Sequence, residues 1–238
     1  MRRKKWRVYQ LLVAAGLVKS KSEAVVLARQ GKITVNGDEM QSLHYQVHPF
    51  KDDIRVNGKK IELKENRQYF ILNKPAGIET TKESILRFLK GKVQAQTLNS
   101  FSPVGRLDKD TKGLLIITND GRLGRRILNP KTKRWKKYIV GFEGKLTEEE
   151  AEQLRNGITI NVEEKPYKTL PAQVTLGKDV HVSIVEGKKR QVRKMLQALG
   201  HPVHTLKRVA IAKLLLGDLK EGDVKEYTKE EMYKLLFE

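Results

Sequence analysis

The sequence predicts an α+β protein, in which a small α/β unit precedes a larger domain with a mixed, mostly antiparallel sheet flanked by helices. Three observations support this prediction. Apolar residues recur at helical spacing in some segments, and in others they alternate or run without a break, as in strands. Asn-Gly pairs join short runs of strand-forming residues at hairpin spacing. Helical and strand segments follow one another irregularly, which is typical of α+β proteins.

The first part of the chain carries the signals of two helices. Apolar side chains at helical spacing predict a helix over residues 6–15, which ends at Gly16. Ser20 and Glu23 have the spacing of a capping box, because each side chain can bond the other residue's backbone amide. They predict the start of a second helix that ends near Arg29.

Short strands follow these helices. Residues 32–35 are a predicted strand that ends at an Asn-Gly turn, residues 36–37. Residues 53–56 are a second predicted strand, which ends at the Asn-Gly turn of residues 57–58. Residues 64–67 are polar and without periodicity, as in a linker. We therefore place a small domain at residues 1–63, a linker at 64–68 and a larger domain at 69–238.

The larger domain is organised around the loop at residues 103–113 and the apolar run that follows it. Residues 114–118 are apolar up to Thr118 and have strand length, which predicts a buried strand. The loop holds Arg106, Asp108 and Asp110 beside that strand. Carboxylates on a rigid element near apolar surface suit catalysis, although an Asp in such a loop is commonly a turn residue.

The spacing of this loop excludes two other carboxylate motifs. A calcium loop needs oxygen ligands where Lys112 and Leu114 stand. In the phosphatase pattern Asp-x-Asp-x-Thr, Thr111 would come one residue later. The other predicted elements of this domain are helices at 84–89, 120–128, 147–156, 191–199 and after Thr228, and strands at 69–72, 137–142, 180–185 and 203–209.

Several motifs together resemble those of the RsuA-type ribosomal RNA pseudouridine synthases. Residues 105–115 have the pattern Gly-Arg-Leu-Asp-x-Asp-Thr-x-Gly-Leu-Leu, which is similar to that family's signature loop. The segments 72–77, 136–138 and 186–203 also fit the family, in the family's order. The helix, the glycine and the Ser-Lys-x-Glu-Ala run before residue 37 resemble the S4-type RNA-binding domain.

The resemblance implies an enzyme that isomerises uridine to pseudouridine in ribosomal RNA without a cofactor or metal. The glycosidic bond breaks, the uracil rotates, and C5 joins the ribose. By resemblance, Asp108 is the catalytic carboxylate, Tyr138 stacks on the displaced base, and the buried charge of Arg193 keeps Asp108 ionised. Asp108 would attack the sugar, attack the base or deprotonate the ribose, and the sequence leaves these three routes open.

Other residues of these motifs are expected to support the reaction. A uridine in folded RNA must leave the stack, and Arg106 is placed to fill the gap or to grip a flanking phosphate. Asp110 is expected to hold the loop through Thr111 and local amides. Lys74 either braces its Pro-Gly turn or meets a phosphate.

The charge of the chain indicates a polyanionic partner. Forty-eight Lys and Arg residues stand against 28 Asp and Glu, a formal net charge of +20. Such an excess favours RNA, because basic side chains release counterions when they bind phosphates. Besides Arg106, the predicted RNA-binding cations are Lys19, Lys21, Arg29 and Lys32 in the small domain and Lys136, Lys188 and Arg190 in the larger one.

The composition excludes other classes of site. The chain has no cysteine, so disulfides, zinc-thiolate sites and thiol catalysis are excluded, and a cytoplasmic protein is expected. Pro49 and Pro202 would interrupt any helix that aligned the two closely spaced histidine pairs, so no metal site is expected. The start resembles a signal peptide, but polar residues at 9–10 interrupt its apolar part and no cleavage site follows. We expect a monomer without a membrane segment.

Two further functions remain open at this point. A non-catalytic, ribosome-associated protein with an S4-type domain would explain the charge and residues 1–62, but not the contexts of Asp108, Tyr138 and Arg193. A DNA-binding regulator would need a recognition-helix signature, which the sequence lacks.

Overall fold

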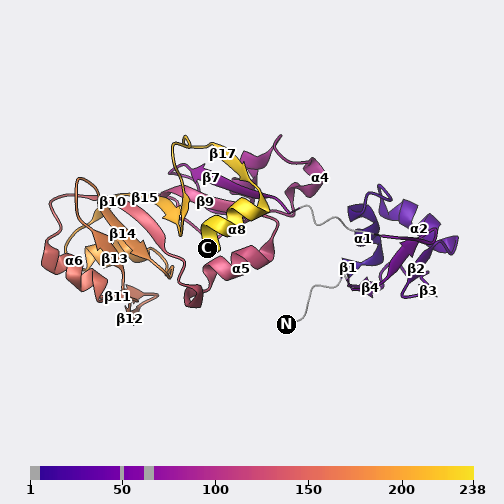
Figure 1. Ribbon diagram of the computed structural model, residues 1–238, viewed down its shortest axis with the longest axis horizontal. Coiled ribbons are helices and arrows are strands. Elements are labelled where there is room, and N and C mark those ends of the chain that lie inside the picture. Colours follow the sequence, from indigo (N-terminus) through magenta and orange to yellow (C-terminus); the bar gives the residue numbers. More distant parts are fainter. Residues whose placement is uncertain (1–5, 49–50, 62–66) are drawn as a thin grey trace. The chain divides into compact units, whose positions relative to one another are not determined.

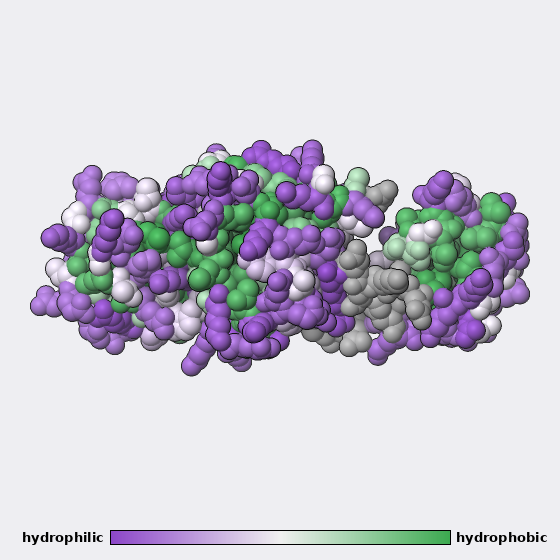
Figure 2. Space-filling view, turned by 45° about the horizontal axis from the view of Figure 1, so that its top comes forward, coloured by the Kyte–Doolittle hydropathy of each residue, from purple (hydrophilic) through white to green (hydrophobic). Residues whose placement is uncertain are grey.

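The computed structural model describes residues 6–48, 51–61 and 67–238 (Figure 1). The chain forms two compact units, Met1–Asn66 and Arg67–Glu238, and each has its own hydrophobic core. Most of the predicted linker at 64–68 lies outside the described residues, so its position stays a prediction. On the face shown in Figure 2, hydrophilic residues cover much of the surface of both units.

The smaller unit combines two helices with short strands. Ser20 accepts a hydrogen bond from the backbone amide of Glu23 at 3.2 Å and caps the second helix, as predicted. The Glu23 carboxylate accepts from the amide of Lys19 rather than from that of Ser20. Asn36 and Asn57 have positive φ, as the Asn-Gly turns require. Its elements are β1 (Trp6–Arg7), α1 (Val8–Ala14), α2 (Lys21–Arg29), β2 (Ile33–Val35), β3 (Asp38–Glu39), β4 (Gln46–Val47), β5 (Ile54–Val56) and β6 (Lys59–Lys60).

Four of these strands form one antiparallel sheet in the order β3-β2-β5-β6, and β1 pairs with β4. The two Asn-Gly hairpins thus join through β2 and β5. The apolar stripe predicted for the first helix is buried, with Val8, Leu11 and Leu12 in the core of this unit.

The larger unit is built on a mixed sheet of nine strands. They are β7 (Tyr69–Lys74), β8 (Ser102–Val104), β9 (Lys112–Thr118), β10 (Lys136–Phe142), β13 (Gln173–Thr175), β14 (Val180–Ile184), β15 (Val203–Ile211), β16 (Leu214–Leu215) and β17 (Val224–Tyr227). Seven follow the order β13-β14-β10-β15-β9-β7-β17, while β16 pairs with β15 and β8 with β9. Only β15 and β9 pair in parallel among these strands, which confirms the predicted mixed, mostly antiparallel sheet.

Helices cover both faces of this sheet. They are α3 (Lys82–Leu86), α4 (Ala95–Leu98), α5 (Gly121–Leu128), α6 (Glu148–Arg155), α7 (Gln191–Gln197) and α8 (Lys229–Phe237), with short 3-10 turns η1 (Arg87–Leu89) and η2 (Pro130–Thr132). Phe70 and Leu72 of β7 share one core with α3, α6 and α7, whereas Tyr69 and Ile71 share the other with α5 and α8. A separate hairpin joins β11 (Thr159–Val162) to β12 (Lys165–Lys168).

The predicted helix caps in this unit are confirmed. Thr147 and Thr228 each form a capping box with the Glu three residues later. Asp120 caps α5 by accepting from the amide of Arg122, and it also accepts from the hydroxyls of Tyr69 and Tyr233. This buried carboxylate therefore fastens β7, α5 and α8 together. In the described part of the chain, no helix is long and apolar enough to cross a membrane.

Candidate active site

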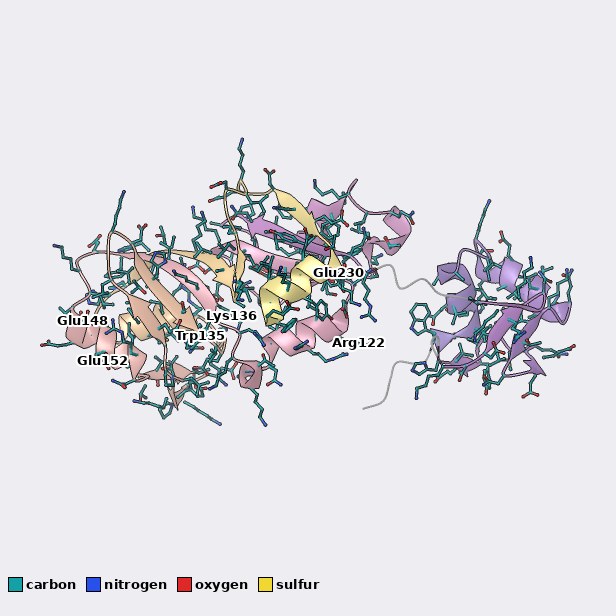
Figure 3. All side chains as sticks on the ribbon, in the orientation of Figure 1. Arg122, Trp135, Lys136, Glu148, Glu152 and Glu230 are labelled. Atoms are coloured by element: carbon teal, nitrogen blue, oxygen red, sulfur yellow. The ribbon has the colours of Figure 1, made fainter. Side chains whose placement is uncertain are left out.

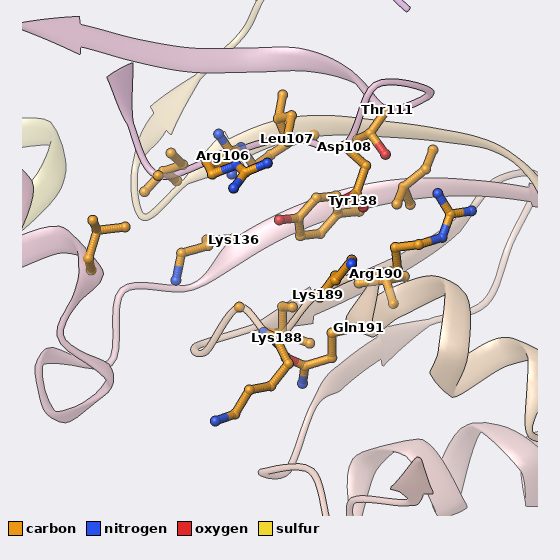
Figure 4. A pocket seen from close by; sticks show the side chains of 18 of the residues that line it. Arg106, Leu107, Asp108, Thr111, Lys136, Tyr138, Lys188, Lys189, Arg190 and Gln191 are labelled. Carbon is orange, nitrogen blue, oxygen red and sulfur yellow. Dashed lines mark hydrogen bonds between the residues drawn. The ribbon is translucent and has the colours of Figure 1, made fainter. Parts of the chain in front are cut away.

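A pocket of about 660 Å³ opens in the larger unit where the signature loop meets β10, β15 and the start of α7. Apolar side chains, among them Leu107, Val192 and Leu206, form part of its wall. Figure 4 shows Tyr138 between the loop that carries Arg106 and Asp108 and the turn before α7. The pocket thus gathers residues that lie up to about a hundred positions apart in the sequence.

The loop that carries Asp108 is anchored on both sides of this residue. The Thr80 hydroxyl donates to the carbonyl oxygen of Leu107 at 2.6 Å and accepts from the Leu107 amide at 3.1 Å. The Gly77 amide donates to the carbonyl oxygen of Lys109 at 2.8 Å. The half-buried Asp108 lines the pocket, so these bonds hold its carboxylate at the pocket wall.

Lys74 supports the same loop from beneath. Its buried ammonium donates to the carbonyl oxygens of Pro75 and Ile78 at 2.7 Å and to that of Lys109 at 3.4 Å. Burial lowers the pKa of Lys74 to about 8, and the charges of Asp110 and Asp108 partly oppose that shift. Of the two roles left open for Lys74, the structure shows the bracing one.

Tyr138 lies on β10, which pairs with β15, the strand that carries Arg208. It is buried, lines the pocket, and is paired in register with Arg208 on β15 and with Val182 on β14. Asp108 and Tyr138 therefore both line one cavity.

Arg193 lies close to the signature loop but pairs with a different carboxylate from the one predicted. Its Nη2 is 3.2 Å from both the carboxylate and the backbone carbonyl oxygen of Asp110, and its Nη1 donates to the carbonyl oxygen of Val203 at 2.7 Å. In the described part of the chain, Arg193 does not pair with Asp108. Burial lowers the pKa of Arg193, whereas the charges of Asp110 and Asp108 oppose this. Asp108 and Arg193 are thus coupled only through space.

Asp110 bonds to residues far along the chain, whereas only local contacts were expected for it. Besides Arg193, its carboxylate accepts two hydrogen bonds from the Arg190 guanidinium, at 3.3 and 3.2 Å. Asp110 therefore ties the signature loop to the start of α7, eighty residues later in the chain. The expected bonds to Thr111 and local amides are not what holds it, because the buried Thr111 hydroxyl has no partner among the described residues.

The predicted RNA-binding cations of the larger unit divide into exposed and buried ones. Arg106, Lys188 and Arg190 are exposed and line the pocket, and Lys189 accompanies them. Their placement at the rim fits contact with a polyanion, although Arg190 is paired with Asp110.

Lys136 differs from the prediction of an exposed cation. It lies at the start of β10, in the middle of the larger unit (Figure 3), and is buried. Its ammonium donates to the carbonyl oxygen of Val185 at 2.9 Å and supports the turn before α7. Burial and, to a smaller extent, repulsion by Arg208 lower the pKa of Lys136 to about 8. The basic run around it predicted exposure, but the strand turns this side chain inward.

The four predicted cations of the smaller unit, Lys19, Lys21, Arg29 and Lys32, are all exposed. The Lys21 ammonium lies 3.2 Å from Nε2 of His44 and 5.7 Å from the centre of the Tyr9 ring. The rings of His44 and Tyr9 thus lie beside Lys21, so flat aromatic surface adjoins the basic surface of this unit.

Sequence reasoning did not select two buried polar residues, Arg208 in the pocket and Glu186 in the turn before α7. Arg208 is 2% exposed, lines the pocket and donates from Nε to the carbonyl oxygen of Leu114 at 2.7 Å. The Glu186 carboxylate accepts hydrogen bonds from the Tyr167 hydroxyl and from the side-chain amide of Gln191. These two bonds fix the turn before α7. An arginine between the apolar Leu206 and Ala210 on alternate positions of β15 was the available signal for Arg208. Among residues 6–48, 51–61 and 67–238, no three His, Asp or Glu side chains are grouped to hold a metal ion.

Comparisons with known proteins agree with this arrangement. The family model for RNA pseudouridylate synthase matches residues 68–198, and the model for the S4 domain matches residues 6–54. The ribosomal large subunit pseudouridine synthase B of Bacillus subtilis is 36% identical over 243 residues, which cover 96% of this chain and 95% of that protein. The ribosomal small subunit pseudouridine synthase A of Haemophilus influenzae is 30% identical over 234 residues, covering 94% and 97%.

A solved structure shares the whole fold. A crystal structure of a pseudouridylate synthase matches with a TM-score of 0.66 and 30% identity, covering 98% of this chain and 100% of that one. The family predicted from the motifs is confirmed, and so is the RNA-binding type of the smaller unit. The chain belongs to the RNA pseudouridine synthase family and is an enzyme of that family with an S4 domain before its catalytic domain.

Proposed function

We propose that this enzyme isomerises a specific uridine of ribosomal RNA to pseudouridine, with Asp108 as the catalytic carboxylate. The observation that carries this proposal is the shared pocket, in which an anchored Asp108 and the ring of Tyr138 face a cavity rimmed by exposed cations. The two ribosomal synthases named above support ribosomal RNA as the substrate. Action on that RNA agrees with the predicted cytoplasmic location.

Asp108 acts on a uridine that has been turned out of the RNA. The bond between N1 of the base and C1′ of the ribose breaks, the base rotates, and a new bond forms between C5 and C1′. The proton on C5 then leaves and N1 gains one, so the product is an isomer of the substrate. Asp108 would start this by attacking C1′, by adding to C6 of the base or by taking the proton from C2′, and each route needs its ionised form.

Tyr138 provides the surface on which the detached base is held. Its ring is buried at the pocket wall, and a flat base stacks on such a ring without needing a specific hydrogen bond. The apolar side chains of Leu107 and Leu206 line the same pocket and exclude water from the broken bond. The base can therefore rotate without escaping.

Arg193 and Asp110 position the loop that carries Asp108. The ion pair and the backbone hydrogen bond between them fasten residue 110 to α7, two positions after the catalytic carboxylate. The charge of Asp108 in turn acts through space on the buried cations Arg193 and Lys74. Arg193 is thus proposed to position the loop that carries Asp108 and to act on the Asp108 carboxylate through space, although it does not pair with Asp108.

The exposed cations hold the RNA around the target. Arg106 stands two residues from Asp108 at the rim, where it would fill the gap left by the extruded uridine or grip a flanking phosphate. The exposed Lys19, Lys21, Arg29 and Lys32 of the S4 domain would bind further RNA phosphates. The non-catalytic alternative accounts for the charge and for residues 1–62, but not for the family match over residues 68–198.

The test is a map of pseudouridine in ribosomal RNA. Purified protein is incubated with unmodified large- and small-subunit transcripts, and carbodiimide-dependent primer extension locates pseudouridine. We expect one new modified position with the wild type and none with Asp108→Asn, whose RNA affinity stays near that of the wild type. The same position should be unmodified in a strain that lacks the gene. An unchanged map in that strain would refute the ribosomal function.

A further inference from the structure

A buried arginine with an unused donor lines the pocket. The guanidinium of Arg208 is held by the bond from Nε to the carbonyl oxygen of Leu114. Its Nη2 is buried and has no hydrogen-bond partner among the described residues. A buried donor without an acceptor is destabilising, and an arginine cannot relieve this by losing its charge. Arg208 therefore has capacity for one more acceptor.

Among the described residues, no carboxylate bonds to the buried Nη2 of Arg208. The neighbouring Lys136 is also buried and cationic, and Arg208 lowers its pKa by repulsion. The buried carboxylate of Glu186 acts on Lys136, but its oxygens are bound by Tyr167 and Gln191. Two buried cations thus line the pocket that also holds Asp108, and they would stabilise a ligand group that gains negative charge beside them.

The position of Arg208 shows which part of a nucleotide would reach it. Arg208 and Tyr138 are paired in register across β15 and β10, so a base stacked on Tyr138 lies beside the arginine. The exposed cations Arg106, Lys188 and Lys189 stand at the rim, where RNA phosphates stay in contact with water. Arg208 is 2% exposed, so the extruded base is the part that comes close to it.

We propose that Arg208 donates a hydrogen bond to a carbonyl oxygen of the target uracil and stabilises the negative charge that the base acquires during the reaction. This rests on the proposed function. When the N1–C1′ bond breaks, its electron pair stays with the ring, and the charge spreads to O2 and O4. If Asp108 instead adds to C6, the charge develops on O4. Arg208 therefore serves every route that starts at Asp108, and it returns to its unpaired state when the product leaves.

The test compares two RNAs that carry either uridine or 5-fluorouridine at the target position. Fluorine withdraws electrons and stabilises the base anion, so the fluorinated base depends less on a cation in the pocket. Rates of rearrangement are measured in single turnovers with saturating enzyme. We expect Arg208→Gln to slow the uridine reaction on the order of 100-fold, as for the loss of one oxyanion donor, and to slow the 5-fluorouridine reaction by a clearly smaller factor.

The ratio of the two rate reductions decides the outcome, because both rates come from one preparation and the folded fraction cancels. Lys207→Gln is the matched control, since the side chain before Arg208 on β15 points to the other face of the sheet and does not line the pocket. It should leave both rates unchanged. Equal reductions on the two RNAs, or a wild-type rate for Arg208→Gln on uridine, would overturn the proposal. A wild-type enzyme that rearranges neither RNA would refute the proposed function instead.

Discussion

Gly113 and Arg208 pair across β9 and β15, the parallel contact of the large sheet, so closely that a Cβ on Gly113 would overlap the backbone of Arg208. Gly113 also has a φ of +109°, which other residues rarely adopt. The glycine of the signature loop thus permits this contact. It brings the loop that carries Asp108 against β15, and β15 in turn pairs with the strand of Tyr138.

Replacing this glycine should disrupt the catalytic domain. Gly113→Ala is expected to lower its free energy of unfolding by about 3 kcal/mol, because the new methyl group overlaps the Arg208 backbone and the φ is unfavourable. Urea unfolding followed by the fluorescence of Trp135, in a Trp6→Phe background, reports on this domain. The control is Gly121→Ala, where nothing lies within 4 Å of the added atom. Equal midpoints for the two variants would contradict the role of the close approach.

Removing the charge of Asp110 should loosen the signature loop. Asp110→Asn breaks the ion pairs with Arg190 and Arg193 and leaves the buried Arg193 without its carboxylate. Because Asp110 is itself half exposed, we expect a loss of only about 1–2 kcal/mol in unfolding free energy, together with slower catalysis. Urea unfolding and single-turnover rates measure the two effects. Asp218→Asn, at an exposed position outside the pocket, should change neither. A fully active Asp110→Asn enzyme would show that the loop does not need this anchor.

Two buried lysines should lose their protons at a lower pH than an ordinary lysine. The pKa values of Lys74 and Lys136 are both lowered to about 8, but different charges surround them. Asp108→Asn removes a charge that raises the pKa of Lys74, so that pKa should fall while that of Lys136 stays. Arg208→Gln removes a repelling charge, so the pKa of Lys136 should rise while that of Lys74 stays. Nuclear magnetic resonance of the lysine side-chain carbons measures both, and shifts at the wrong lysine would count against the described contacts.

The same shifts give a pH dependence of stability. Each lysine has a folded-state pKa near 8 and an unfolded-state value of 10.5, so the unfolded chain binds more protons between these values. The contribution of both lysines to the free energy of unfolding should therefore rise with pH from about 8 to 10.5. Below pH 8 both are charged when buried, and the cost is present in full. In Lys136→Met the rise should be smaller, and an identical pH profile would contradict this.

The S4 domain should contribute to RNA binding mainly through charge. Changing Lys19, Lys21, Arg29 and Lys32 together to Gln should weaken binding and flatten the dependence of log K on log salt concentration. Each phosphate that the variant no longer neutralises should reduce the slope by about 0.7–0.9. Filter binding at a series of salt concentrations measures the slope. Lys229→Gln with Lys234→Gln, on α8 of the catalytic domain, is a control that should leave it nearly unchanged. An unaltered slope in the fourfold variant would refute the predicted S4 interface.

Local chemistry made much of the fold predictable. The capping residues Thr147 and Thr228 and the apolar run at 114–118 carry their signals in a few neighbouring residues, and the structure confirms each. The edge strands β13 and β17 were not predicted, because they are short, mostly polar and formed only by pairing with β14 and β7.

The site was predictable only as far as motifs mark it. Asp108 and Tyr138 stand in recognisable patterns and line one pocket. The partner of Arg193 depends on how α7 docks against a loop some eighty residues earlier, which no local pattern encodes. Lys136 stands in a basic run, but the strand turns it inward. Arg208 is brought to the site only by the pairing of β10 with β15, which no local pattern encodes.

The central claim is that the carboxylate of Asp108 performs the reaction in which the base loses its bond from N1 to the ribose and gains one from C5. Its most direct test uses ribosomal RNA tritiated at C5 of uridine, because that hydrogen is released to water only when C5 has joined the ribose. We predict that the wild-type enzyme releases tritium up to one equivalent per RNA. Asp108→Asn should bind the same RNA with similar affinity and release none. Release by Asp108→Asn at the wild-type rate would show that another group performs the chemistry.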